Sequence, residues 1–324
     1  MIIKVNLKPE YDIKIEKGII INKGLPEGFV VVDSNIFKKY KDLIKGDFII
    51  VKAGEKNKSI KSYLKIMEKL AEADTDKIIA FGGGVVGDLA GFAASTYKRG
   101  IPLIQVPTSL LAMIDASIGG KNGVNLGGKK NYAGTIYQPE KVLIDTLFLN
   151  SLSKKEFRNG LAEMIKYAIV FNKPELNRFE FKVNSKDEDF GKLIEESCQV
   201  KVGIIEKDVD DKGLRHVLNF GHTIGHAIEL LASLSHGEAI SIGMVKELEL
   251  GVEENLIDKE KLEKVKRCLE KNKLPVEFPA NIDKEKVLEL MKKDKKGSLV
   301  FAFDEKNYNV KIEEEKIRKF LFNS

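Results

Sequence analysis

Short, continuously apolar segments alternate with helical segments through the first 150 residues, and this alternation is the strongest constraint on the fold. Residues 29–33, 48–51, 77–81 and 102–107 are predicted to form buried strands, and residues 13–15 alternate like an exposed strand. Between them, residues 59–73 carry apolar side chains at helical spacing. Strands that alternate with helices predict an α/β, Rossmann-like domain with a largely parallel sheet.

The second half of the chain has a different periodicity. Helical spacing dominates it, and strand-like runs return only at residues 299–303 and 308–312. The predicted helical segments are residues 154–170, 187–206, 214–232, 236–254, 259–272 and 283–293. We therefore expect an α/β domain over residues 1–150 and a mainly α-helical domain over residues 151–324.

Charge and cysteine usage exclude several classes of protein. The net charge is +5, from 54 basic and 49 acidic residues that are interspersed, so composition does not favour nucleic-acid binding. No apolar run reaches the roughly 18 residues that a membrane span requires, and the first residues do not resemble a signal peptide. Cys198 and Cys268 form no metal-type pair, and we expect a cytoplasmic protein.

A glycine-rich loop follows the strand predicted at residues 77–81. The run Gly82-Gly83-Gly84-Val85-Val86-Gly87 fits G-x-G-x-x-G between a strand and a helix, the setting of dinucleotide phosphate binding. It departs from the usual fingerprint because it lies outside the first β-α-β unit and no acid ends the next strand. Asp33 ends an earlier strand, and Glu55 is a second candidate for the ribose hydroxyls.

All four histidines lie within 21 residues: His216, His222, His226 and His236. His222 and His226 are four apart in a helical segment, so spacing alone nominates both as metal ligands. Glu163 is an acid in an otherwise apolar helical stretch with Lys166 one turn later, which is typical of a paired or functional acid. The cluster indicates a metal site.

Glycines, lysines and amides gather at residues 115–123 and 127–131. Glycine allows the main chain to approach a ligand, while lysine and asparagine supply hydrogen-bond donors. Arg99 and Arg215 add two guanidinium groups suited to anions. These segments predict a site for a phosphate or a carboxylate.

Together these segments resemble the 3-dehydroquinate synthase family, one of the sugar phosphate cyclases, over residues 31–296. The resemblance lies in GGGVVGDLAGFAASTYKRG (82–100), QVPTSLLAMIDASIGGKNGVN (105–125), GKKNYAG (128–134), GLAEMIKYA (160–168), GLRHVLNFGHTIGHAIE (213–229), HGEAISIGM (236–244) and DKK (294–296). Ser109 and Ser151 stand where the family often has threonine, and residues 125–128 differ from the commoner loop.

The resemblance implies a role for each matching residue. It places a divalent metal, Zn²⁺ or Co²⁺, on Glu163, His222 and His236, and turns His226 toward the substrate. It implies that substrate binding and catalysis involve Asp115, Lys121, Lys130, Asn131, Lys166, Lys201, Arg215, Asn219 and His226, together with Lys295 or Lys296. It also implies a homodimer in which Arg99 of a neighbouring subunit contacts the substrate. The residues that it implies for NAD binding are Asp33, Asn35, Glu55, Lys58, Gly83, Gly84, Val85, Asp88, Thr108, Ser109, Lys121, Lys130, Phe148 and Ser151.

The resemblance also implies the reaction. The substrate would be 3-deoxy-D-arabino-heptulosonate 7-phosphate, on the shikimate route to aromatic amino acids, and the steps would be oxidation, phosphate loss, reduction and ring closure without net redox change. Three alternatives remain open: a sister sugar-phosphate cyclase, a metal-dependent polyol dehydrogenase and a non-catalytic NAD-binding regulator. Arg215 and Lys201 favour an acid substrate.

Overall fold

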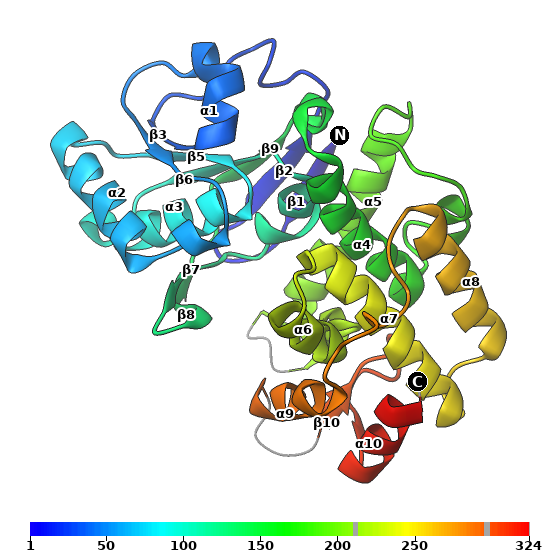
Figure 1. Ribbon diagram of the computed structural model, residues 1–324. Helices are drawn as coiled ribbons and strands as arrows, with labels where there is room; N and C mark the ends of the chain where they lie inside the picture. The colour runs from blue at the N-terminus through cyan, green and yellow to red at the C-terminus, as the bar shows by residue number, and fades with distance from the viewer. Residues whose placement is uncertain (210–212, 295–298, 324) are drawn as a thin grey trace. The chain divides into compact units, whose positions relative to one another are not determined.

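The computed structural model describes residues 1–209, 213–294 and 299–323, and its contacts divide the chain into two compact units (Figure 1). The first unit is Met1–Phe157 with Ser185–Val209, and the second is Arg158–Asn184 with Asp210–Ser324. Residues 185–209 thus pack with the first unit, although they follow residue 150 in the chain. The expected domain boundary near residue 150 stays a prediction.

The first unit is built on a seven-stranded sheet of order β1-β2-β9-β6-β5-β3-β4. Its strands are β1 Ile2–Val5, β2 Tyr11–Ile15, β3 Phe29–Asp33, β4 Phe48–Val51, β5 Ile78–Gly82, β6 Leu103–Pro107 and β9 Lys141–Ile144. All neighbouring pairs are parallel except β1 with β2. The predicted α/β class with a largely parallel sheet is confirmed. A separate antiparallel hairpin joins β7 Lys121–Leu126 to β8 Lys129–Ile136.

Helices cover both faces of this sheet because side chains on each strand alternate between the faces. On one face Val31, Ile78 and Ala80 pack against α2 (Ile60–Ala73) and α3 (Gly84–Thr96). On the other face the ring of Phe148 lies between those of Phe81 and Tyr40, the last residue of α1 (Ser34–Tyr40). Helix α5, Phe190–Lys207, also belongs to this unit.

The prediction of a buried strand at residues 48–51 was wrong in one respect. A strand forms there, but β4 is the edge of the sheet, and Phe48 and Ile50 are 41% and 42% exposed. An apolar run cannot by itself distinguish a central strand from an edge strand, because the distinction depends on pairing with distant segments.

The second unit is mainly helical, as predicted. It contains most of α4 (Lys154–Phe171) together with α6 His222–Leu231, α7 His236–Glu253, α8 Lys259–Lys271, α9 Lys284–Asp294, α10 Glu314–Asn323 and the hairpin β10 Leu299–Phe301 with β11 Val310–Ile312. The single helix predicted over residues 214–232 is divided into a 3₁₀ turn, Leu214–Asn219, and α6. The break follows from Gly221, whose φ of +77° is left-handed and leaves the helical conformation.

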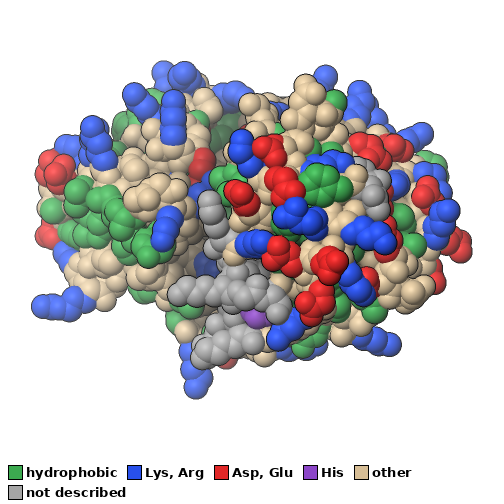
Figure 2. All heavy atoms as spheres, turned by 60° about the horizontal axis from the view of Figure 1, so that its bottom comes forward, with side chains coloured by type: hydrophobic (Ala, Val, Ile, Leu, Met, Phe, Trp, Pro, Cys, Tyr) green, Lys and Arg blue, Asp and Glu red, His purple; other side chains and the backbone are tan. Residues whose placement is uncertain are grey.

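Charge is distributed as the sequence indicated. On the face drawn in Figure 2, basic side chains are spread over the surface and many lie beside acidic ones. Among the described residues, no helix combines the length and apolar character needed to cross a bilayer.

Candidate functional site

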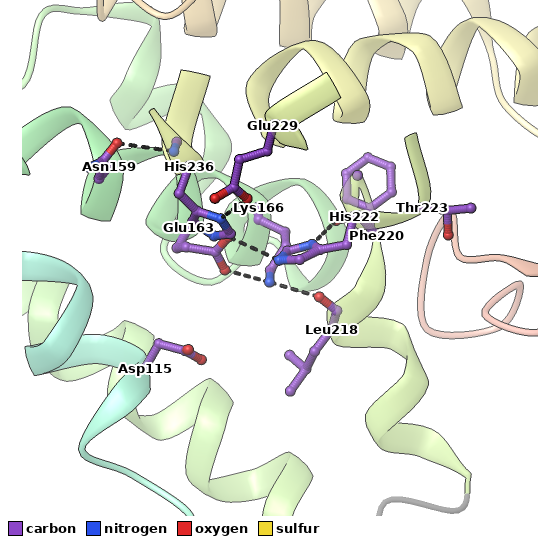
Figure 3. A network of polar contacts seen from close by, with 12 residues as sticks. Asp115, Asn159, Glu163, Lys166, Leu218, Phe220, His222, Thr223, Glu229 and His236 are labelled. Carbon is purple, nitrogen blue, oxygen red and sulfur yellow. Dashed lines mark hydrogen bonds and ion pairs between the residues drawn. The ribbon is translucent and has the colours of Figure 1, made fainter. Parts of the chain in front are cut away.

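Three helices of the second unit bring the predicted metal ligands together. Glu163 lies in the middle of α4, while His222 and His236 are the first residues of α6 and α7. One ligand atom from each lies within 4.8 Å of the others. Nε2 of His222 is 3.5 Å and Nε2 of His236 is 3.6 Å from Oε1 of Glu163, and Figure 3 shows the three side chains pointing toward one another.

Both imidazoles are held through their other nitrogen. Nδ1 of His222 lies 3.0 Å from the carbonyl oxygen of Phe220, and Nδ1 of His236 lies 3.1 Å from Oε2 of Glu229 (Figure 3). Because a carbonyl and a carboxylate are acceptors, each Nδ1–H donates, so in the neutral form of each ring the lone pair is on Nε2. Metal-binding histidines are commonly oriented by such outer partners.

The two oxygens of Glu163 have different environments. Oε2 pairs with Nζ of Lys166 at 2.5 Å, and that Nζ also donates to the carbonyl oxygen of Leu218 at 2.8 Å. Oε1 is buried and has no hydrogen-bond partner among the described atoms. A buried acceptor without a partner is costly, and a cation between Oε1 and the two Nε2 atoms would remove that cost. One carboxylate and two imidazoles suit Zn²⁺ or Co²⁺, so these residues fit the implied metal.

The charges of this set are strongly perturbed. Burial alone would raise the pKa of Glu163, but Lys166, His222 and His236 together hold that pKa well below its usual range. Burial, reinforced by Lys166, lowers the pKa of His222 to about 3. Burial also acts to lower the pKa of His236, but its contacts with Glu163 and Glu229 outweigh burial and raise that pKa to about 9. Glu163 is therefore ionised and His222 neutral at neutral pH, whereas His236 is protonated and would release a proton when it binds a cation.

His226 lies on the same face of α6 as His222, and their ring centroids are 5.1 Å apart. Its ligand atoms group with those of Glu229 and His236 rather than with Glu163. Of the remaining predicted substrate residues of this unit, Arg215 is buried in the 3₁₀ turn that also carries Asn219, while Lys295 and Lys296 lie outside the described residues. The metal and substrate assignments stay proposals.

In the first unit, the glycine loop connects β5 to α3 as predicted. Gly83 is the N-cap of α3 and has no side chain to cap it, and Gly84, Val85 and Asp88 belong to the first turns. A Cβ on Gly82 would lie 2.8 Å from Cβ of Val86, so the loop is closely packed as well as narrow. Helix N-terminal N–H groups beside a side-chain-free backbone suit a pyrophosphate.

Asp33 has a structural role that the sequence analysis missed. It is the N-cap of α1, and its Oδ1 accepts from the backbone N–H groups of Asn35 at 2.7 Å and Ile36 at 3.4 Å. An acid after a strand can therefore begin a helix as well as bind a ribose.

The other NAD candidates form a chain of polar contacts. Lys58 is buried, pairs with Asp88 and lies 3.9 Å from Oε1 of Glu55. Burial raises the pKa of Asp88 to about 6, against the effect of Lys58. Nδ2 of Asn125 donates to Oε1 of Glu55 at 2.9 Å, and Oδ1 of Asn125 accepts from the N–H of Asn131 at 2.9 Å. Asn125, which the sequence analysis did not single out, thus links the NAD candidates to the Lys130–Asn131 hairpin.

Two further pairs of candidates differ in character. Nζ of Lys201 on α5 lies 2.6 Å from Oδ1 of Asp115, which brings two predicted catalytic residues together. Phe148 is fully buried, so its ring belongs to the core, and Ser151 donates to its carbonyl oxygen at 2.9 Å.

The remaining candidates of this unit lie at sheet ends and turns. Thr108 and Ser109 follow β6, Lys121 begins β7, and Arg99 occupies a left-handed conformation with φ +67° in the turn after α3.

Comparison with known proteins decides the family. The model of the 3-dehydroquinate synthase N-terminal domain matches residues 48–159, and that of the C-terminal domain matches residues 160–297. The chain belongs to the 3-dehydroquinate synthase family. The resemblance seen in the sequence is thereby confirmed.

Relatives with the family's name are similar over most of their length. The 3-dehydroquinate synthase of Thermoanaerobacter pseudethanolicus is 38% identical over 309 residues, 89% of this chain and 86% of the relative. That of Thermodesulfovibrio yellowstonii is 41% identical over 301 residues, 89% and 82% of the two chains.

Two solved structures of synthases have the same fold. The 2-epi-5-epi-valiolone synthase from Streptomyces hygroscopicus, solved with NAD⁺ and Zn²⁺ bound, has a TM-score of 0.82 and 25% identity, with 97% of this chain and 96% of that chain covered. A 2-deoxy-scyllo-inosose synthase has a TM-score of 0.85 and 22% identity, and all of each chain is covered.

Proposed function

We propose that this member of the 3-dehydroquinate synthase family converts 3-deoxy-D-arabino-heptulosonate 7-phosphate to 3-dehydroquinate and phosphate. Relatives named 3-dehydroquinate synthase at 38–41% identity support the substrate. The observation that carries the proposal is the convergence of Glu163, His222 and His236 with a buried, unpartnered carboxylate oxygen.

Each group of residues has a part in the proposed reaction. When bound, NAD exchanges a hydride with the substrate and the divalent metal acts as a Lewis acid on substrate oxygens. Glu163, His222 and His236 hold the metal, and Lys166 keeps Glu163 ionised and oriented. The N-terminus of α3, with Asp33, Glu55, Lys58 and Asp88, holds NAD.

Cationic and amide side chains bind the phosphate and the carboxylate of the substrate. Lys121, Lys130 and Asn131 bind the phosphate, and Arg215 with lysines such as Lys201 binds the carboxylate. Their contribution is positioning and fixed positive charge. His226 relays hydroxyl protons, since imidazole exchanges protons near neutral pH.

The assembly and location complete the proposal. Arg99 would reach the phosphate held by a second copy of the chain, which makes the active form a homodimer. Scarcity of cysteine fits the reducing cytoplasm. Sedimentation of the purified protein tests the dimer, and an Arg99→Ala variant that remains dimeric should bind the substrate more weakly.

A substrate panel tests the reaction. Protein loaded with Zn²⁺ and NAD should release phosphate from the heptulosonate phosphate without accumulating NADH. Stoichiometric NADH would instead indicate a polyol dehydrogenase. Faster phosphate release from glucose 6-phosphate, or from a heptulose 7-phosphate without a carboxylate, would indicate a sister cyclase.

A further inference from the structure

A fully buried carboxylate lies beside the metal ligands without belonging to them. Glu247 on α7 is 0% exposed, which is unusual for an ionisable side chain. Its Oε2 accepts from the N–H of Gly221 at 2.8 Å, and its Oε1 accepts from the N–H groups of Thr223 at 3.1 Å and Ile224 at 3.3 Å. These donors surround His222, the first residue of α6.

The sequence explains why α6 needs this acceptor. The first N–H groups of a helix have no partner within the helix, and an N-cap side chain normally accepts from them. The N-cap of α6 is Gly221, which has no side chain and has a φ of +77°. A Cβ there would lie 2.4 Å from Cγ of Met244, so no other residue fits. Glu247 supplies the missing cap from another helix, and its charge suits the helix N-terminus.

This contact fixes the backbone on which His222 stands. The N–H groups immediately before and after His222 are both held by Glu247. The ring of His222 is oriented by the carbonyl oxygen of Phe220, one residue further back. A shift of the first turn of α6 would therefore move Nε2 of His222 relative to Glu163. Metal–ligand distances tolerate only about 0.2 Å.

We propose that Glu247 is a positioning residue of the metal centre: by capping the first turn of α6 it sets the place of Nε2 of His222 and thereby the affinity and geometry of the bound ion. This rests on the metal site of the proposed function. Glu247 and His236 also share α7, so one helix carries one ligand and holds the backbone of another.

Glu247→Gln is the sharpest variant because it preserves size but replaces one acceptor oxygen by an NH₂ group, which cannot accept from a backbone N–H. Ser241→Ala is a matched control, since Ser241 is equally buried on α7 and bonds elsewhere, to the carbonyl oxygen of Pro275 at 2.7 Å. Both variants remove a buried hydrogen bond made by a side chain of the same helix.

The measurements are Zn²⁺ affinity by competition with a chromophoric chelator and the visible absorption spectrum of the Co²⁺ form. Glu247→Gln should weaken Zn²⁺ binding about 10–100-fold, as lost outer partners of metal ligands do, and should change the Co²⁺ bands. Ser241→Ala should retain the wild-type affinity and spectrum even if it lowers the unfolding temperature.

The outcomes separate the two proposals. Glu247→Gln that is less stable but binds Zn²⁺ with wild-type affinity and spectrum would overturn the positioning role and leave a purely structural cap. If Glu247→Gln does not fold, Glu247→Asp, which keeps the charge on a shorter side chain, is compared in the same way. Wild-type protein that binds no Zn²⁺ would instead refute the metal site of the proposed function.

Discussion

At the scale of single residues, the metal set depends on which atom of each ligand is already engaged. Both imidazoles donate through Nδ1, and Lys166 occupies one oxygen of Glu163, so two ring nitrogens and one oxygen converge. Each ligand is thus prepared by a neighbour that would not itself touch the ion. Substitution of a ligand and substitution of its partner should therefore have different effects on metal binding.

Removal of a ligand should abolish metal retention. In His236→Ala we expect Zn²⁺ binding to weaken by at least about 100-fold, beyond the loss typical of an outer partner, and activity to fall with it. His216→Ala is the control, because His216 contacts Asn309 outside the set. Metal content after dialysis measures both, and an unchanged content in His236→Ala contradicts the ligand assignment.

Asp88 should give the protein a recognisable pH response. Burial raises its pKa from 3.8 to about 6, so between these values the folded chain binds more protons at this site than the unfolded chain. Its contribution to the free energy of unfolding is therefore fully present below about pH 4 and declines by at most about 3 kcal/mol as the pH rises through 6. Urea unfolding at several pH values should show that Asp88→Asn lacks this decline, and parallel profiles would argue against the raised pKa.

The sequence predicted some residues of the candidate site and missed others. Spacing nominated His222 with His226, and these rings are indeed neighbours on α6, but spacing within one helix cannot tell which other helices approach it. Glu163 was noticed because an acid in an apolar stretch is unusual. Asn125 and Glu247 were missed because their importance arises from contacts with distant backbone groups, which leave no local pattern.

At the scale of elements, the close approach of α6 and α7 sets the site. A Cβ on Gly243 of α7 would lie 2.0 Å from the carbonyl oxygen of Gly221 and 2.7 Å from N of Gly225 on α6. Glycine lets the helix backbones meet directly, so that the two histidines at their N-terminal ends converge on one acid.

A methyl group at this crossing should therefore separate the helices. We expect Gly243→Ala to destabilise the protein by about 3 kcal/mol or more, since overpacking against backbone cannot be relieved by side-chain rotation, and to weaken Zn²⁺ binding. Gly203→Ala on α5 is the control: its Cβ meets no described atom within 4 Å, and it should stabilise by about 0.4–1 kcal/mol. Equal urea midpoints for the two variants would contradict the close crossing.

Elements with strong local patterns were predicted well. The strand at residues 29–33 and the start of α2 after Ser59, whose Oγ accepts from the N–H of Ser62 at 3.3 Å, agree with the structure. The sequence predicts no strand for the hairpin of β7 and β8, because its glycines, lysines and amides lack alternation. It forms through pairing and through the contact of Asn125 with Lys58, which composition does not reveal.

At the scale of the whole molecule, stability should depend on the bound ion. A ligand that binds only the folded state at 100 times its dissociation constant contributes about 2.7 kcal/mol, so a chelator should lower the unfolding temperature and Zn²⁺ should restore it. His236→Ala should show neither effect. A chelator response that persists unchanged in His236→Ala would point to an ion bound elsewhere.

The partner that orients His222 is a backbone carbonyl and the partner that orients His236 is a side chain, so a single mutation can remove the second but not the first. The carbonyl of Phe220 belongs to the main chain and is encoded whatever residue occupies that position, whereas the carboxylate of Glu229 can be lost through one codon. Natural or engineered substitutions therefore alter the contact of His236 with Glu229 more readily than the contact of His222 with the carbonyl of Phe220. Exchange of Glu229 for aspartate or glutamine is the direct way to change which ion the site retains. The contact of His222 changes only through substitutions that move the backbone at Phe220.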